Sequence, residues 1–381
     1  MHQENTEKML QDIMTAEQCA LMQQLLKESE TIVLTCHVNP DGDAIGSCLA
    51  WAEVIRTVYN KEPQIIIPDQ YPDFLQWMPN TERIIRYDKH KEGCDWTLQH
   101  CDLIFCLDFN TPSRVDAMQQ ALESSPAKKV LIDHHLNPTV DTVLTISHPE
   151  ACSTCELVFR VVWQMGCFEA LSKHFAVPLY CGMMTDTGGF TYNSSDCDVY
   201  FIISQLLTKK IDKDKIYRNV YNTFSENRLR LTGYVLYEKL VVKPALHASY
   251  FTLTRQDLKR FKFIKGDAEG LVNMPLQMKG HKLSISLRED TERDNLVWVS
   301  LRSVDDFPCN EVAARFFNGG GHLNASGGRL FCSMAEAVKV AEQAIEAFKD
   351  RLQAYKMSTI EMDQFGPMRF KNNILTLQSK N

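Results

Sequence analysis

The 381-residue chain lacks an apolar run that approaches the roughly 20 residues needed to cross a bilayer. Its opening residues, Met1 to Lys8, are polar, and no apolar segment of secretory type follows them. An excess of positive charge is also missing, since the formal net charge is −7. These absences predict a cytoplasmic protein that neither enters a membrane nor binds long duplex nucleic acid, because such binding needs many lysines and arginines aligned with phosphates.

Disulfide bonds are not expected either. The 13 cysteines are odd in number and no export signal precedes them, so they are predicted to be reduced thiols that pack as small hydrophobes. Cys152 and Cys155 have a Cys-x-x-Cys spacing, but no second pair at zinc-finger spacing accompanies them. Capping of the next helix by Ser153 and Glu156 explains this tetrad better.

Apolar runs alternate with helical periodicity in the first half of the chain, which is typical of a parallel α/β sheet. A helix is expected over about residues 9–27 and another over about 44–59. The expected strands are Thr31–Cys36, Gln64–Ile67, Leu103–Leu107 and Val130–Ile132. Residues 153–224 have a mostly helical pattern that completes the first domain.

The second half predicts a smaller α/β domain joined to the first by a helical linker. Strands are expected at Ser249–Leu253, Leu283–Arg288 and Val297–Arg302, and a closing amphipathic helix at about 335–352. The predicted organisation is a catalytic domain at 1–225, a linker at 226–245, a second domain at 246–355 and a tail at 356–381. The length suits two domains because single cores seldom grow this large.

The first chemical signal is the loop from His37 to Asp43, between an expected strand and an expected helix. In open α/β sheets, ligands bind beyond the carboxyl ends of the strands, and this loop lies at such an end. Gly42 permits a tight backbone path, so Asp41 and Asp43 can turn toward the same point.

Further candidate ligands follow two more strands. Asp108 follows Leu103–Leu107, and Asp133, His134 and His135 follow Val130–Ile132. Asp186 precedes a glycine pair at an expected helix end. An isolated Asp-Gly-Asp is usually a turn, and an isolated His-His pair is usually packing or solvent contact. Their joint occurrence at successive strand ends favours a metal site instead.

Carboxylates and imidazoles together suit manganese, magnesium, zinc or iron better than calcium alone. Four carboxylates gathered in one place repel one another, so several would have to stay protonated without cations. Two divalent ions neutralise four such charges and leave a site that can accept a phosphate.

These residues resemble the DHH phosphoesterases, named for the triplet seen here as Asp133-His134-His135. The resemblance includes the His37-to-Asp43 loop, Asp108 and the segment Asp186-Thr187-Gly188-Gly189-Phe190. In the second half, Asn318 to Gly327 resembles the glycine-rich signature of the DHH-associated C-terminal domain. The bacterial nanoRNases, which degrade short oligoribonucleotides and often dephosphorylate 3′-phosphoadenosine 5′-phosphate, are the subgroup that the sequence resembles most.

The resemblance implies a division of roles. His37 and Asp41 would hold one ion, while Asp43, His134 and Asp186 would hold the other. Asp108 would bridge both, and His135 would contact the phosphate or assist the leaving oxygen. Family members typically use Mn²⁺, with Mg²⁺ or Co²⁺ as alternatives, and the active site would lie in the cleft between the domains.

The same resemblance implies a set of substrate-binding residues. Consecutive glycines offer backbone N–H groups without side chains in the way, although Gly-Gly-Gly alone is usually a flexible loop. An arginine grips phosphate through two hydrogen bonds, although a strand-end arginine is often only solvated. The expected substrate contacts are Arg114, Arg302, Gly320, Gly321, His322 and Ser326.

The sequence therefore predicts a two-metal hydrolase that cleaves short single-stranded RNA or nucleotide phosphates to mononucleotides. Water would attack phosphorus in line and the 3′-oxygen would depart. A pyrophosphatase or polyphosphatase with the same cluster is one alternative, which the glycine-rich second domain disfavours. A catalytically silent nucleotide-binding module is another, and a homodimer is left open.

Overall fold

The structure is a computed structural model that describes residues 10–264 and 266–354. The first residue of the expected N-terminal helix and the expected tail at 356–381 lie outside these residues. The described chain divides into two compact units. The first contains the residues up to Lys239 together with Leu253–Leu271, and the second contains Leu240–Thr252 and the residues from Val272 onward. Within the described residues, no helix is long and apolar enough to span a membrane.

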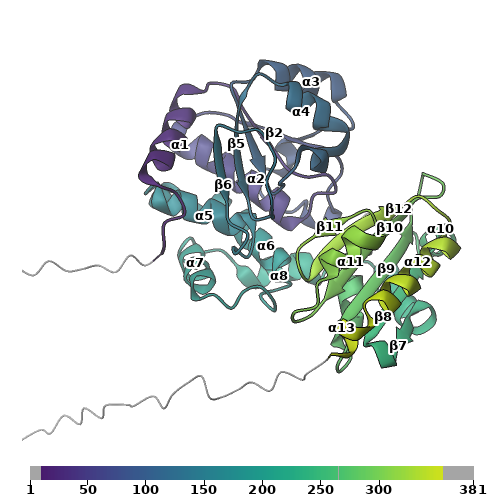
Figure 1. Cartoon of the computed structure of the whole chain (residues 1–381). Coiled ribbons are helices and arrows are strands. Elements are labelled where there is room, and N and C mark those ends of the chain that lie inside the picture. The colour runs from purple at the N-terminus through teal and green to yellow at the C-terminus, as the bar shows by residue number, and fades with distance from the viewer. Residues whose placement is uncertain (1–9, 265, 355–381) are drawn as a thin grey trace, which may run out of the picture. The chain divides into compact units, whose positions relative to one another are not determined.

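The first unit alternates strands and helices, as expected for α/β structure (Figure 1). Its strands are β1 (Ile32–Thr35), β2 (Gln64–Ile67), β3 (Ile84–Arg86), β4 (Leu103–Leu107), β5 (Lys128–Asp133) and β6 (Leu144–Ser147). Its helices are α1 (Ala16–Glu28), α2 (Gly42–Tyr59), α3 (Lys91–His100), α4 (Gln119–Ser124), α5 (Thr154–Gln164), α6 (Lys173–Asp186), α7 (Cys197–Thr208), α8 (Lys213–Tyr221), α9 (Glu226–Tyr234) and α10 (Arg255–Arg260).

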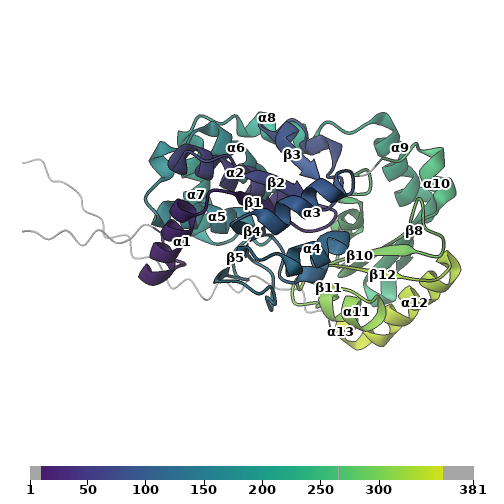
Figure 2. The same cartoon turned by 90° about the horizontal axis from the view of Figure 1, so that it is seen from above.

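All six strands of this unit form one parallel sheet, in the order β3-β2-β1-β4-β5-β6. Side chains alternate between its faces because successive residues of a strand point in opposite directions. Leu103, Phe105 and Leu107 of β4 pack into the core that contains α2, α5 and α6, whereas Ile104 and Cys106 pack into the core beneath α3 and α4. Helices therefore cover both faces (Figure 2), and the strand ends are left to carry polar residues.

The second unit has a six-stranded sheet in the order β11-β12-β10-β9-β8-β7. Its elements are β7 (Val241–Lys243), β8 (Ala248–Leu253), β9 (Leu283–Glu289), β10 (Val297–Ser303), α11 (Cys309–Phe316), β11 (Gly320–Gly321), β12 (Ala325–Leu330), α12 (Met334–Ala347) and α13 (Lys349–Gln353). The β9–β10 and β10–β12 pairs are antiparallel. Alternate residues of β9 and β10, such as Ile285 and Val299, pack with Ala337 and Ala341 of α12 in a second core.

The expected α/β class and the two sheets are confirmed, and one expected element is wrong in part. Helix α9 continues as a π-helical turn over Val235–Lys239, but Val241–Lys243 is a strand instead of the end of a helical linker. Two residues of β7, Val241 and Val242, pair with Tyr250 and Ser249 of β8, and this pairing overrides the helical pattern that precedes them. The expected limits of the domains remain predictions.

Glycines allow α2 and α6 to approach closely beneath the strand ends. A Cβ atom added at Gly46 of α2 would lie 2.5 Å from the carbonyl oxygen of Pro178 in α6. One added at Gly182 of α6 would lie 2.3 Å from Cys155 Sγ and 3.1 Å from Asp43 Oδ1. Any larger residue would therefore push the two helices apart at the level of Asp43.

We expect Gly46→Ala to lower the free energy of unfolding by about 1–3 kcal/mol, the usual cost of overpacking. Gly93→Ala is the matched control, because Gly93 lies in α3 with no atom within 4 Å of its added Cβ. There the better helix propensity of alanine should stabilise the protein by up to about 1 kcal/mol. Thermal unfolding of both variants measures the difference, and equal unfolding temperatures would contradict the packing argument.

Candidate metal centre

The polar residues expected at the strand ends meet at the carboxyl edge of the parallel sheet. His37 follows β1, Asp108 follows β4, and His134 follows β5 directly. Two helix termini add further carboxylates, since Asp41 is the N-cap of α2 and Asp186 is the last residue of α6. Segments that are distant in sequence thus deliver their side chains to one place because parallel strands end at the same edge.

Asp108 lies at the centre of the cluster. Its Oδ2 is 3.4 Å from His37 Nε2, and its Oδ1 is 3.6 Å from His134 Nε2. One group of possible ligand atoms comes from His37, Asp41 and Asp108, and another from Asp43, Asp108 and His134. Within each group the atoms lie within 4.8 Å of one another. The same carboxylate therefore belongs to two adjacent sets of ligands.

Asp186 approaches the second set from the end of α6. Its Oδ2 is 3.6 Å from His134 Nε2, and its side chain remains 28% exposed. Asp108 and His134 are 2% exposed. The cluster is thus enclosed by protein on one side and open near Asp186.

Backbone geometry at Asp108 is held in an uncommon conformation. Its φ is +64°, in the left-handed region that side chains other than glycine rarely adopt. The Asp108 N–H donates to the carbonyl of Ile132 at 3.1 Å, and Thr154 Oγ1 donates to Asp108 Oδ1 at 3.0 Å. Such strain persists only where the surroundings determine the conformation, and it is common at functional sites.

Asp43 is fixed by the start of α5. Its carboxylate accepts hydrogen bonds from the backbone N–H groups of Thr154, at 2.6 Å, and Cys155, at 2.9 Å. The amino terminus of a helix favours negative charge, so this contact stabilises the ionised carboxylate. Ser153 caps α5 as expected, accepting from the N–H of Glu156.

Both histidines turn Nε2 toward the carboxylates. His37 Nδ1 donates to the carbonyl of Val38 at 2.8 Å, and His134 Nδ1 donates to that of Ala151 at 3.2 Å. A proton on Nδ1 leaves the lone pair of Nε2 for a metal ion, which is the usual arrangement of metal-binding histidines.

His135 has a different partner. Its Nδ1 is 2.7 Å from Oδ1 of Asp133, which is fully buried, while Oδ2 of Asp133 has no hydrogen-bond partner among the described residues. The pair fixes the orientation of the His135 ring. Asp133 was expected as a candidate ligand because it ends β5 within the triplet, and the structure shows it in contact with His135.

Arg114 lies near the same cluster. Its carbonyl accepts from the Val38 N–H at 2.7 Å, and its buried Nε has no hydrogen-bond partner in the part of the chain that the structure describes. Burial, and then the charge of Arg114, lower the pKa of His37 to about 4. His37 is therefore neutral near pH 7, as a metal ligand must be.

The remaining expected substrate contacts lie in the second unit and neighbour one another there. Arg302 of β10 pairs with Ala325, and Gly321 of β11 pairs with Ser326. Ser326 is buried, and its hydroxyl donates to the carbonyl of His322 at 2.8 Å. Gly320 is exposed with open space around its Cα, so the backbone there is accessible to a ligand. Their role in binding remains a prediction.

Without cations, the buried carboxylates of this site are unfavourable in their ionised form. Burial raises the pKa of Asp108 well above its usual range, and the charges of Asp43, Asp41 and Asp186 raise it further. Burial also raises the pKa of Asp43, although His134 opposes this. This donor set of carboxylates and imidazoles fits hard or borderline divalent cations, which would relieve the repulsion.

Models of known protein families match both parts of the chain. The profile of the DHH family, N-terminal domain, matches residues 31–183, and that of the DHHA1 domain matches residues 246–354. The chain belongs to the DHH family. Asp133, His134 and His135, the triplet from which the family is named, all lie in the cluster described above.

Several relatives within this DHH family are similar over most of their length. The chain is 28% identical to a probable bifunctional oligoribonuclease and PAP phosphatase NrnA of Streptococcus mutans, over 82% of this chain and 93% of that protein. It is 26% identical to the bifunctional oligoribonuclease and PAP phosphatase NrnA of Thermus thermophilus, over 88% and 95%. The crystal structure of an exopolyphosphatase-related protein from Bacteroides fragilis is 49% identical with a TM-score of 0.85, over 90% and 100%. The names of these relatives describe hydrolases or a hydrolase-related protein.

We expect binding of Mn²⁺ to release protons. The raised pKa of Asp108 means that this carboxyl holds its proton to higher pH in the folded, metal-free protein than in the unfolded chain, so its own contribution to stability falls as the pH rises. A metal ion needs the ionised carboxylate, so its apparent affinity should rise with pH, by about tenfold per unit for each proton released. Titration calorimetry at pH 7 in buffers of different ionisation enthalpy counts these protons.

The Asp108→Asn variant provides the comparison because its amide carries no such proton. It should bind Mn²⁺ more weakly and with fewer protons released. Equal affinities at pH 6 and pH 8 in the unaltered protein would contradict the electrostatic account.

Proposed function

We propose that the chain is a two-metal phosphoesterase that hydrolyses short oligoribonucleotides to mononucleotides and also acts on 3′-phosphoadenosine 5′-phosphate. The observation that carries this proposal is the position of Asp108, which lies 3.4 Å from His37 Nε2 and 3.6 Å from His134 Nε2 and so joins two sets of possible ligands. The names of the NrnA relatives support the choice of substrates.

The proposed ligand sets follow from these distances. His37, Asp41 and Asp108 would hold one ion, and Asp43, Asp108, His134 and Asp186 the other. Two divalent cations, when bound, lower the pKa of water and neutralise charge that develops on a phosphoryl group. We propose Mn²⁺ as the native ion, since the mixed carboxylate and imidazole set suits it, with Mg²⁺ or Co²⁺ as substitutes.

Residues around the ligands would bind and orient the substrate. Arg114 brings a guanidinium beside His37, and its buried Nε is available to donate to a phosphate oxygen. His135, oriented by Asp133, would hold a proton for the departing 3′-oxygen. In the second unit, Arg302 and the backbone of Gly320 and Gly321 would contact the far end of a short substrate.

Short substrates suit the charge of the protein. A net charge of −7 opposes binding of a long polyanion, but a fragment of a few nucleotides needs only a few local contacts. A pyrophosphatase or polyphosphatase remains the second candidate, because the similar Bacteroides fragilis protein is described as exopolyphosphatase-related.

The decisive assay compares substrates in the presence of Mn²⁺. We expect release of mononucleotides from a diribonucleotide and of phosphate from 3′-phosphoadenosine 5′-phosphate, at rates well above phosphate release from pyrophosphate or polyphosphate. Faster release from pyrophosphate would favour the second candidate. Binding of the diribonucleotide without any cleavage would indicate a catalytically silent nucleotide-binding module.

Asp108→Asn should lower kcat for the diribonucleotide by at least about 10³-fold, because a shared ligand and its charge are both removed. Asp141→Asn is the control, since Asp141 is an exposed aspartate in the segment between β5 and β6 of the same unit. It should leave kcat unchanged. Full activity of the Asp108 variant would refute the proposed site.

A further inference from the structure

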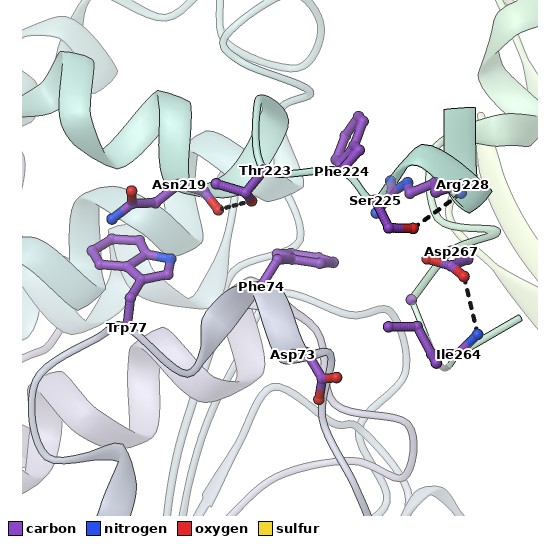
Figure 3. Close-up of a pocket in the computed structure, with 11 residues that line it drawn as sticks. Asp73, Phe74, Trp77, Asn219, Thr223, Phe224, Ser225, Arg228, Ile264 and Asp267 are labelled. Atoms are coloured by element: carbon purple, nitrogen blue, oxygen red, sulfur yellow. Dashed lines mark hydrogen bonds between the residues drawn. The ribbon is translucent and has the colours of Figure 1, made fainter. Parts of the chain in front are cut away.

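A cavity of about 320 Å³ lies within the first unit, among residues that the metal centre does not use. Three segments line it: the 3₁₀ turn Asp73–Leu75 with Trp77, the end of α8 with the start of α9, and, after α10, the residues Ile264, Gly266 and Asp267. Figure 3 shows their side chains around a common space. The volume is at the lower end of the range for small-molecule sites, about 300–1,000 Å³.

Aromatic rings form much of the wall. Phe74 and Trp77 come from the segment after β2, and Phe224 comes from the turn between α8 and α9. In Figure 3 the side chains of Trp77 and Phe74 lie across from those of Asn219, in α8, and Thr223, just after it. Such surfaces suit a planar ring, because bases stack on aromatic side chains with little dependence on sequence.

Arg228 supplies a buried positive charge at this cavity. The residue is 8% exposed, and its guanidinium lies 3.6 Å from the ring centroid of Phe224 and 5.8 Å from that of Phe74. Its Nη2 donates to the carbonyl of Glu269 at 2.9 Å. Burial lowers the pKa of Arg228, which the charges of Glu269 and Asp267 partly oppose.

Two carboxylates that line the cavity accept hydrogen bonds from neighbouring groups. Asp267 Oδ2 accepts from the N–H of Ile264 at 3.0 Å, and Asp73 Oδ1 accepts from Gln76 Nε2 at 2.9 Å. The charges of Glu269 and Asp267 lie near Arg228 and favour its charged form. A guanidinium buried with one carbonyl partner retains donors for an anion, and a buried charge gains most from such a partner.

Trp77 adds an independent signal. Its indole Nε1 is buried and has no hydrogen-bond partner among the residues described. Buried indole N–H groups usually find an acceptor, and the ring lines the cavity. An acceptor atom on a ligand would satisfy this donor.

We propose that this cavity binds a nucleoside 5′-monophosphate, with its base against Phe74 and Trp77 and its phosphate on Arg228. The choice of a nucleoside monophosphate among planar anions rests on the proposed function, because the proposed reaction releases nucleoside monophosphates. The site itself does not, because none of its lining residues is a proposed metal ligand.

The test is titration calorimetry of the full-length protein with AMP, with all divalent metal chelated so that no turnover occurs. Adenosine, ribose 5-phosphate and the dinucleotide pApA are titrated in parallel. We expect AMP to bind more tightly than either of its halves. Binding of adenosine as tight as that of AMP, binding of pApA alone, or no AMP binding at millimolar concentration would each overturn the proposal.

Arg228→Gln should weaken AMP binding by about tenfold or more, since it removes a charge-assisted hydrogen bond. Arg230→Gln is the matched control, because Arg230 is exposed on the same helix, α9, and pairs with Glu226 at 2.7 Å. It should bind AMP as the unaltered protein does. A folded Arg228 variant that retains full affinity would contradict the assignment.

Trp77→Phe provides a second test that does not disturb the buried charge. It keeps an aromatic ring and removes the N–H, so AMP should bind about twofold to tenfold more weakly. Unchanged AMP affinity would show that Trp77 does not contact the ligand and would remove this support.

The two proposals fail separately. If the protein hydrolyses the diribonucleotide with Mn²⁺ but does not bind AMP when the metal is chelated, only the proposed nucleotide site is overturned. Retained AMP binding in a protein that hydrolyses neither the diribonucleotide nor 3′-phosphoadenosine 5′-phosphate would overturn the proposed function alone.

Discussion

Mutual repulsion among buried carboxylates is the constraint on which the first unit depends. Asp108 and Asp43 are nearly inaccessible to solvent, and Asp41 and Asp186 lie close enough to raise the pKa of Asp108 further. Four ionised carboxylates this close together are unfavourable on their own, and bound cations would make their ionised form favourable. The hydrogen bonds from the start of α5 to Asp43, and from Thr154 to Asp108, hold this arrangement before any ion enters.

Several features of the fold together hold these carboxylates close to one another. A parallel sheet covered on both faces brings three strand ends together, and glycines at positions 46 and 182 let α2 and α6 pass close beneath them. The left-handed backbone of Asp108 is held by pairing with β5 through Ile132. Under the proposed function, preorganisation of this kind lets a phosphate bind with little rearrangement.

Much of this could be predicted from the sequence because the signals are local. The apolar run Leu103–Leu107 coincides with β4, and Asp186 stands at the end of α6 where the glycine pair predicted a helix terminus. Strands β3 and β6 were not predicted, because short or half-buried strands have too few apolar residues in a regular pattern. Val241–Lys243, which lies inside the expected helical linker, forms a strand because it pairs with β8, and such a tertiary contact leaves no local signal in the sequence.

The interactions that orient the side chains of the site could not be predicted from the sequence either. The bond between His135 and Asp133, and the two N–H groups of α5 that hold Asp43, depend on how segments meet in space. The aromatic residues around Arg228 gave no periodic signal, since they come from separate segments. Local patterns place elements and their terminal residues, whereas pairing and orientation follow from packing.

The central claim, that two ions share Asp108, is tested most directly by anomalous diffraction from crystals grown with Mn²⁺. The account predicts two peaks about 3.5–4 Å apart, one beside His37 and Asp41 and one beside Asp43, His134 and Asp186, with Asp108 between them. A single peak, or manganese bound away from Asp108, would contradict it.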